Sequence, residues 1–386
     1  MGLENNIPED WVETTLGEVC EIKYGKDHKK LNDGNIPCFG SGGLMRKVSE
    51  VLYDKPSVLI PRKGTLTNLF FIDEPFWTVD TLFYTKINLS KIIPKYLFYR
   101  LKTYNLESLN VGSAVPSLTT AVLNQFPFSI PNIQEQKAIA KILTAFDDKI
   151  ELLQNQNKTL ETMAQTIFKE WFGKYQIGDE LPEGWRVGKI TELFEVRDGT
   201  HDSPKEAKTG KHLITSKHII KGRIKFEESY FISETDFNEI NRRSKVDQYD
   251  ILFSMIGTLG LTYFEQNTNI DYAIKNLALF KTSQKKEFTI YTYLWLTGKH
   301  GVHYVLQNKS GSTQEFMSLG SLRNIEFIIP ESQILVDFNK LCIPVFKKIQ
   351  TNNLQVQSLT KTRNILLPKL MSGQVRVNNI KQLASA

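Results

Sequence analysis

The chain has 386 residues, which is enough for two or three domains, and its 41% hydrophobic and 23% charged composition is typical of a globular protein. It contains no apolar run near the ~20 residues that cross a bilayer and no secretory signal at its N-terminus, so we expect a cytoplasmic protein. The net charge of +6 favours polyanionic partners, because neutralised phosphates release counterions.

The chain contains an internal repeat, and its first copy begins near the N-terminus. PEDWVETTLGEVCEIKYGK, from Pro8, returns as PEGWRVGKITELFEVRDGT from Pro182, a spacing of 174. VLIPRKGTLTN from Val58 resembles ILFSMIGTLGL from Ile251, and the glycine segment from Gly112 resembles that from Gly311. Three matches in the same order indicate a duplication. The growing spacing predicts about 25 extra residues in the second copy, which we expect in surface loops.

Each copy has the pattern of a mixed α/β module. Short β-branched and aromatic runs between turn residues predict strands at 57–60, 82–84, 126–130, 251–253 and 277–280. Pro94 suits the first turn of a helix over 94–100, and a counterpart helix is expected near 289–296.

A long helix should follow each module. Apolar residues recur at steps of three and four from Phe146 to Trp171 and from Val345 to Leu370, which predicts two heptad seams. A helix over 134–172 would be roughly 60 Å long at about 1.5 Å per residue. Gly173 and Gly373 suit C-terminal caps, whereas Pro344 and Pro368 should kink or fray the second helix.

One asparagine interrupts each seam. Asn157 and Asn352 either fix the register of the helix pair or lie at frayed, exposed points, and the sequence does not separate these alternatives. If the helices pair antiparallel, a pseudo-two-fold axis would place one module at each end of a rod. Such a rod would act as a ruler between two short sequences on DNA, where one face repeats every ~34 Å.

The whole chain resembles the specificity subunit of type I restriction–modification systems. The resemblance rests on the Pro-Glu-x-Trp openings, the stretch 36–43, the Gly-Thr-Leu turns at Gly64 and Gly257, the segment 130–136 and the segment 367–373. It implies a mixed α/β fold: two similar target-recognition domains separated by two long helices that pair as an antiparallel coiled coil with pseudo-two-fold symmetry. The expected boundaries are 1–131 and 174–330 for the recognition domains, 132–173 and 331–373 for the helices, and 374–386 for a tail.

The resemblance also implies partners and cofactors. Double-stranded DNA, two methyltransferase (modification) subunits and restriction/translocase subunits are the expected partners, and no membrane is expected. Each recognition domain would read one half of a two-part target for methylation of adenine N6. S-adenosylmethionine and ATP with Mg would bind only the partner subunits, so this chain would carry no cofactor and no catalytic residue. The chain accordingly lacks the Asn-Pro-Pro-Tyr or Asp-Pro-Pro-Tyr motif and the Walker lysine loop.

Basic and polar loop residues are the candidates for DNA contact, through phosphates or guanine edges. Their alternative is a solvated surface or a loop-stabilising role. The candidates are Lys26, His28, Lys29, Ser41, Arg46, Lys47, Arg62, Lys63, Ser113, Arg197, His201, Lys217, Arg223, Arg242, Arg243, Ser312 and Gln314.

Five helix residues are candidates for partner binding: Glu135, Gln136, Leu152, Met163 and Phe168. The first two form the Glu-Gln pair at the start of the first helix, which the second helix lacks. The other three lie off the seam and suit partner helices, although the chain's own modules could cover them.

Several patterns argue against cofactor and metal sites. The stretch 39–43 is rich in glycine but precedes no convincing helix, so a tight turn or a close approach to DNA is expected rather than a nucleotide loop. His300 and His303 have no third ligand at a suitable spacing and should lie on a loop or helix surface. Three cysteines without a paired motif predict buried thiols.

Two other functions remain open from the residues alone. A coiled-coil scaffold with two non-DNA ligand-binding modules would show no salt-dependent affinity for DNA. A free-standing methyltransferase would bind S-adenosylmethionine, although the motifs for it are missing.

Overall fold

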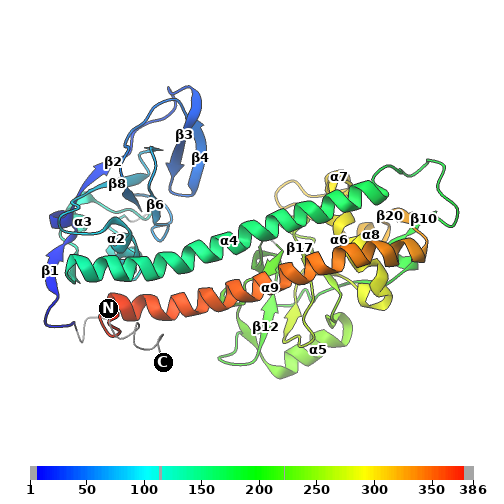
Figure 1. Cartoon of the computed structure of the whole chain (residues 1–386). Helices are drawn as coiled ribbons and strands as arrows, with labels where there is room; N and C mark the ends of the chain where they lie inside the picture. The colour runs from blue at the N-terminus through cyan, green and yellow to red at the C-terminus, as the bar shows by residue number, and fades with distance from the viewer. Residues whose placement is uncertain (1–6, 113–114, 221, 378–386) are drawn as a thin grey trace. The chain divides into compact units, whose positions relative to one another are not determined.

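The computed structural model describes residues 7–112, 115–220 and 222–377, which divide into two compact units (Figure 1). The first unit comprises Met1–Leu152 with Val356–Ala386, and the second comprises Leu153–Gln355. Each unit therefore contains one α/β module and part of both long helices.

The first unit contains three small sheets. Its elements are β1 (Val12–Thr15), α1 (Leu16–Val19), β2 (Cys20–Tyr24), β3 (Asp33–Gly40), β4 (Gly43–Val48), β5 (Ser57–Pro61), β6 (Phe70–Ile72), β7 (Trp77–Thr78), β8 (Leu82–Ile87), α2 (Pro94–Leu101), η2 (Leu106–Leu109), α3 (Thr120–Asn124) and β9 (Pro127–Ile130). The four-stranded sheet is antiparallel in the order β2-β8-β5-β6. The three-stranded sheet has the order β4-β3-β7, with β3 and β7 parallel, and β1 pairs with β9.

The second unit repeats this topology. Its elements are β10 (Arg186–Lys189), η3 (Ile190–Glu192), β11 (Val196–Asp198), β12 (Lys211–Ile214), η4 (Ser216–His218), β13 (Ile219–Ile220), β14 (Arg223–Ile224), η5 (Phe226–Glu228), β15 (Phe231–Ile232), α5 (Glu234–Ser244), β16 (Ile251–Ser254), β17 (Thr262–Phe264), β18 (Tyr272–Ile274), β19 (Leu277–Phe280), η6 (Thr282–Phe288), α6 (Thr289–Thr297), α7 (Lys299–Asn308), α8 (Leu319–Arg323) and β20 (Glu326–Ile329). The orders β11-β19-β16-β17, β15-β12-β18 and β10-β20 reproduce the three sheets, including the single parallel pair. The structure thus confirms the duplication.

Most of the extra residues of the second unit form regular elements, so the expectation that they lie in surface loops is wrong for most of them. Between β12 and β15 they form the hairpin β13–β14, and between β15 and β16 they form helix α5. Ser233 caps α5 by accepting a hydrogen bond from the Asp236 backbone N–H, and acidic residues occupy its first turn. Both features stabilise a helix start, which explains why the insertion is ordered.

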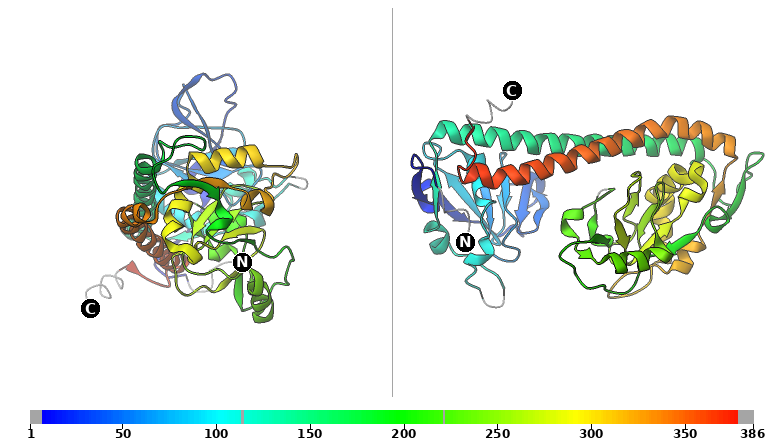
Figure 2. Two further views of the ribbon diagram at one scale, coloured as in Figure 1. Left: turned by 90° about the vertical axis from the view of Figure 1, so that its right-hand side faces the viewer. Right: turned by 90° about the horizontal axis from the view of Figure 1, so that it is seen from below.

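The central strands and the modules' helices follow from local sequence. Every residue of β5 and β16 is buried, as expected for short apolar runs in the middle of a sheet. Pro94 occupies the first turn of α2, and the counterpart helix α6 exists over Thr289–Thr297. In each unit the largest core cluster contains residues of strands, of short helices and of the adjacent segments of the two long helices, which run alongside the module (Figure 2).

Two 40-residue helices, α4 (Ile133–Phe172) and α9 (Ser332–Met371), carry the heptad seams. Pro344 and Pro368 both lie inside α9, so the expectation that they fray the helix is wrong, whereas the alternative that they kink it stays a prediction. A proline removes one N–H, and the amide of Ser372 still donates to the carbonyl of Pro368. Gly373 follows α9 in the left-handed region, at φ 72°, which confirms its role as a cap.

The helices are antiparallel within each unit. In the second unit, Asn157 on α4 meets Asn352 and Asn353 on α9, whereas the later residue Phe168 meets the earlier residue Phe338. In the first unit, Asp147 pairs with Arg363. Asn157 and Asn352 are 8% and 0% exposed, so the reading as frayed, exposed points is wrong.

All three cysteines are free and buried, as predicted. Burial raises the pKa of Cys20 and of Cys342 to about 12, so both remain thiols at neutral pH. Within the described residues, no helix is long and apolar enough to cross a membrane.

Candidate nucleic-acid interface

One edge of the four-stranded sheet gathers the glycine loops of the first unit. Strand β2 ends and β8 begins at this edge, where Tyr24 pairs with Phe83, and β5 ends there at Pro61. The loop after β5 is fastened to the glycine loop that precedes α3, because Gly64 N–H donates to the carbonyl of Pro116 at 3.1 Å. We call residues 24–30, 62–68, 80–81 and 115–118 the first loop edge.

The second unit builds the same edge. Asp198 at the end of β11 pairs with Ala278, and Ser254 at the end of β16 pairs with Leu277. The amide of Gly257 donates to the carbonyl of Glu315 at 3.0 Å, which reproduces the contact of Gly64. We call residues 198–203, 255–261, 275–276 and 310–317 the second loop edge.

The geometry at the matched glycines explains why both copies have glycine at these positions. An added Cβ would lie 2.0 Å from the carbonyl oxygen of Val79 at Gly25, and 2.4 Å from that of Ile274 at Gly199. Gly64 and Gly257 have φ values of 90° and 79°, in the region that favours glycine. Backbone conformation and close packing therefore fix both loop edges.

Three candidates meet at the first loop edge or beside it. The guanidinium of Arg62 lies 5.2 Å from the ring centre of Tyr24 and donates to the carbonyl of Asp80 at 3.1 Å. Ser41 is tied to this edge, because its carbonyl accepts from the side chain of Asn68 at 3.0 Å. Lys63 is exposed beside Arg62. Tyr24 and Asn68 carried no separate signal in the sequence.

The other candidates of the first unit are distributed more widely. Lys26 and Lys29 are exposed in the loop after β2, and His28 is half-buried between them. Lys47 is exposed on β4, whereas Arg46 donates to the carbonyl of Leu31 at 2.5 Å. Arg46 therefore connects β4 to the segment just before β3. Ser113 lies outside the described residues.

The glycine-rich stretch forms the turn of the hairpin β3–β4, with Gly40 opposite Gly43. Strand β4 follows it, which agrees with the expectation that no helix begins there.

The second loop edge holds a cluster of charged and amide side chains. Asp198 accepts hydrogen bonds from His201 at 2.9 Å and from Arg243 at 2.6 Å. Arg197 is paired with Glu195 at 2.6 Å and also donates to the carbonyl of Arg243. The sequence reasoning named the cations of this cluster but missed the carboxylate between them.

The glycine loop and the inserted elements carry the remaining candidates. Ser312 and Gln314 are exposed in the loop that follows Ser310. Lys217 lies on η4, Arg223 is half-buried on β14, and Arg242 is exposed on α5. These last three belong to the insertion that distinguishes the second unit.

The Glu-Gln pair lies within the first unit. Glu135 pairs with Arg376 at 2.7 Å, and Arg376 also binds Asp10. Gln136 is 1% exposed: its side-chain oxygen accepts from the amide of Ile93, and its nitrogen donates to the carbonyls of Lys91 and Pro131. Because Gln136 is buried, it has no free surface for a partner. In the second unit the matching position is Leu335, which is fully buried and needs no polar contact.

The off-seam residues divide into two groups. Leu152 and Met163 are 49% and 50% exposed on α4. Phe168 is 5% exposed and packs on Phe172, Tyr291 and Phe338, so the chain's own second module covers it. The alternative considered from the sequence, that the chain's own modules cover an off-seam residue, therefore holds for Phe168.

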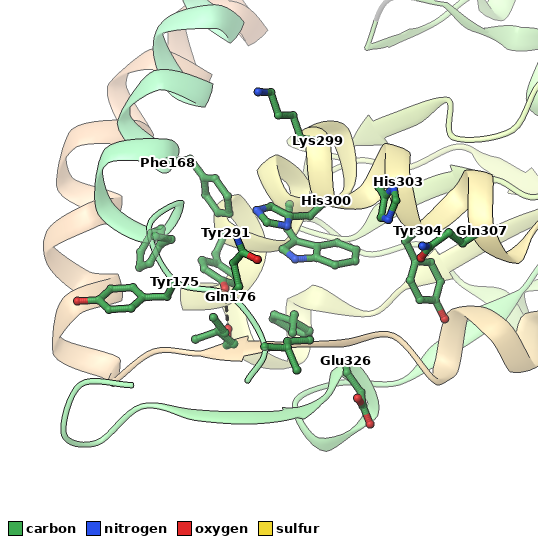
Figure 3. A pocket seen from close by; sticks show the side chains of 15 residues that line it. Phe168, Tyr175, Gln176, Tyr291, Lys299, His300, His303, Tyr304, Gln307 and Glu326 are labelled. Carbon is green, nitrogen blue, oxygen red and sulfur yellow. Dashed lines mark hydrogen bonds between the residues drawn. The ribbon is translucent and has the colours of Figure 1, made fainter. Parts of the chain in front are cut away.

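The second unit also contains an open cavity of about 750 Å³, lined largely by aromatic residues (Figure 3). Phe168 and Tyr291 line its base, and His300 and His303 extend from α7. Both histidines are exposed, as predicted. Among the described residues, no group of three or more His, Cys, Asp or Glu side chains is arranged to hold a metal ion.

Two similar α/β modules, each with a loop edge built on glycine turns and joined through paired long helices, are the features of a DNA specificity protein. The sequence matches the family described as type I restriction modification DNA specificity domain over residues 8–162 and again over 182–358. These matches cover most of the chain, which therefore belongs to this family.

Relatives of this chain that carry names are also specificity subunits of type I restriction enzymes. The chain is 28% identical to the type I restriction enzyme MjaIX specificity subunit of Methanocaldococcus jannaschii, over 97% of this chain and 95% of the relative. It is 23% identical to the HindI specificity subunit of Haemophilus influenzae, over 92% and 91%. The crystal structure of the type I restriction–modification S subunit from M. genitalium has the same fold, with a TM-score of 0.60, 17% identity and coverage of 96% and 98%.

Proposed function

We propose that this specificity subunit reads a two-part DNA sequence, one half with each loop edge. One observation carries the proposal: both units build the same edge, with Gly64 N–H donating to Pro116 and Gly257 N–H donating to Glu315. The backbone frame is shared, whereas the side chains that it presents differ. A shared frame with different side chains suits two half-sites of different sequence. Family membership favours this function over a scaffold that binds other ligands.

The exposed side chains fit both kinds of DNA contact. Lys26, Lys29 and Lys63 are exposed cations that can neutralise phosphates and so contribute a salt-dependent affinity. Arginine pairs with the O6 and N7 acceptors of guanine in the major groove, and the amide of Gln314 matches adenine. The proposed readers are therefore side chains of the loops, with the strands as a rigid support.

Catalysis and its cofactors are proposed for partner subunits. The chain would direct two modification subunits, which bind S-adenosylmethionine and methylate adenine N6, and restriction/translocase subunits, which use ATP with Mg. The exposed side chains of Leu152 and Met163 on α4 are proposed contacts for a modification subunit.

Exchange of one module tests this assignment. Residues 8–130 are replaced by the first module of another family member, and the chimaera is assembled with its modification subunits and used to methylate a DNA library. One half of the methylated sequence should change and the other half should persist. The reciprocal exchange of residues 182–329 is the matched control and should change only the other half. A change of both halves in either chimaera would contradict independent reading.

A further inference from the structure

A carboxylate at the second loop edge has no assigned role. Asp198 is the last residue of β11, and its side chain is 15% exposed. Its two oxygens accept from two different basic side chains: Oδ2 from Nε2 of His201 at 2.9 Å and Oδ1 from Nη2 of Arg243 at 2.6 Å. These two partners are 58% and 60% exposed, so the cluster presents them outward from a partly buried anchor.

Further contacts restrict the side chains of both partners. The other ring nitrogen of His201, Nδ1, lies 2.9 Å from Oδ1 of Asn276. Asn276 has a φ of 54°, a left-handed conformation that asparagine tolerates, and its amide donates to the carbonyl of Thr200. Arg243 also donates to the carbonyl of Gly199 at 3.3 Å. The side chains of His201 and Arg243 are therefore held by side-chain and backbone groups together.

Three chain segments that are distant in sequence converge on Asp198. They are the loop after β11, the turn between β18 and β19, and the C-terminal end of α5. At the repeat spacing of 174, the first unit has Tyr24 where the second has Asp198, and α5 is part of the insertion. The cluster is therefore a feature of the second unit.

The arrangement leaves specific donors available. Nη2 of Arg243 is used within the cluster, whereas its side chain remains mostly exposed. Because Nη2 faces Asp198 and Gly199, the N–H groups of Nη1 remain, and they can donate to a single acceptor such as guanine O6 or N7 in the major groove. Holding the side chain before binding reduces the conformational entropy lost on binding.

We propose that Asp198 is a positioning residue for DNA specificity: it orients Arg243 and His201 to read a guanine-containing position of the second half-site. This inference rests on the proposed function. Asp198 does not itself contact DNA, because its two oxygens face His201 and Arg243. Arg243 supplies the direct contact, and His201 is held beside it.

The test compares Asp198→Asn with the full-length wild-type chain, each assembled with its modification subunits. Methylation is measured on duplexes in which the second half-site is randomised one position at a time. The variant should lose about tenfold or more of its preference for guanine at one position. Preferences in the first half-site should remain. Asp179→Asn, an exposed residue of the second unit outside the second loop edge with the same change of charge, is the matched control and should read as wild type.

A merely structural role makes a different prediction. If Asp198 only supported the fold, methylation would fall by the same factor at every position of the second half-site, and this result would overturn the proposal. Unchanged preferences in Asp198→Asn would also overturn it. A wild-type chain without any two-part preference would instead contradict the proposed function.

Arg243→Gln keeps the proposal testable should Asp198→Asn fail to fold. Arg243 is exposed at the end of α5, and truncating its charge leaves β11 intact. This variant should lose preference at a guanine position in the second half-site only. Retained preference at every position would overturn the proposal.

Discussion

At the scale of single residues, the loop edges depend on glycines that tolerate no side chain. Gly25 and Gly199 pack directly on carbonyl oxygens, whereas Gly42 has no atom within 4 Å of an added Cβ. Gly25→Ala and Gly199→Ala should each destabilise the protein by about 1–3 kcal/mol, because the backbone must move to accept the methyl group. Gly42→Ala is the control and should change stability by less than about 0.5 kcal/mol.

Urea unfolding, followed separately for each variant, measures these changes. Equal stability of the Gly25 and Gly42 variants would show that the close approach does not constrain the loop edge.

At the scale of elements, the asparagine contact fixes how α4 meets α9 in the second unit. Nδ2 of Asn352 donates to Oδ1 of Asn157 at 2.8 Å, and both side chains are buried. Asn157→Leu should cost about 1–3 kcal/mol, because it leaves buried polar groups of α9 without partners. Adding Asn352→Leu should cost less than the sum of the single changes. A double-mutant cycle measures the coupling, and strict additivity would contradict a direct contact.

A second element-scale contact joins the start of the chain to the segment after α9. Arg376 hydrogen-bonds to Asp10 and holds the pKa of that carboxyl below its ordinary value of 3.8. A lowered pKa means that this stabilisation is complete above about pH 4 and is lost as the pH falls further. Arg376→Gln should therefore flatten the acid-induced loss of stability of the first unit.

Thermal unfolding between pH 5 and pH 2 measures this effect. Lys369→Gln, an exposed change of equal charge in the last turn of α9, should leave the pH profile unaltered. A wild-type profile in Arg376→Gln would contradict the role of this contact.

Many of the helices and strands could be predicted from the sequence. Heptad spacing predicted both long helices to within a few residues, and ordered matches predicted the duplicated modules. The insertion was placed in loops because a difference in length does not show which elements form, and the cap at Ser233 with the acidic first turn of α5 was a signal left unused. Gln136 was read as a partner contact because its role depends on Ile93, 43 residues away.

The candidate site was predictable only in part. Glycine turns located the loop edges, because backbone constraints leave a local signal. Asp198 escaped prediction because its partner Arg243 is 45 residues distant in sequence and is brought near only by the fold. Cations distant from the edges, such as Lys217, look the same in sequence as those that lie on them.

At the scale of the whole molecule, helix length should set the distance between the half-sites. Inserting one heptad into α4 near residue 154 and one into α9 near residue 355 preserves the antiparallel register of the seams. Seven residues add about 10 Å of helix, which corresponds to roughly three base pairs of DNA. The methylated sequence should keep both halves and gain a longer spacer. An unchanged spacer would show that the helices do not measure distance.

The measurement that tests the central claim most directly is a map of adenine methylation across the genome of a strain that expresses this gene with its modification subunits. The map is compared with that of the same strain after deletion of the gene. The account predicts the loss of one split motif, with two defined parts around a fixed unspecified spacer, and its return on complementation. An identical methylation map with and without the gene would contradict the account.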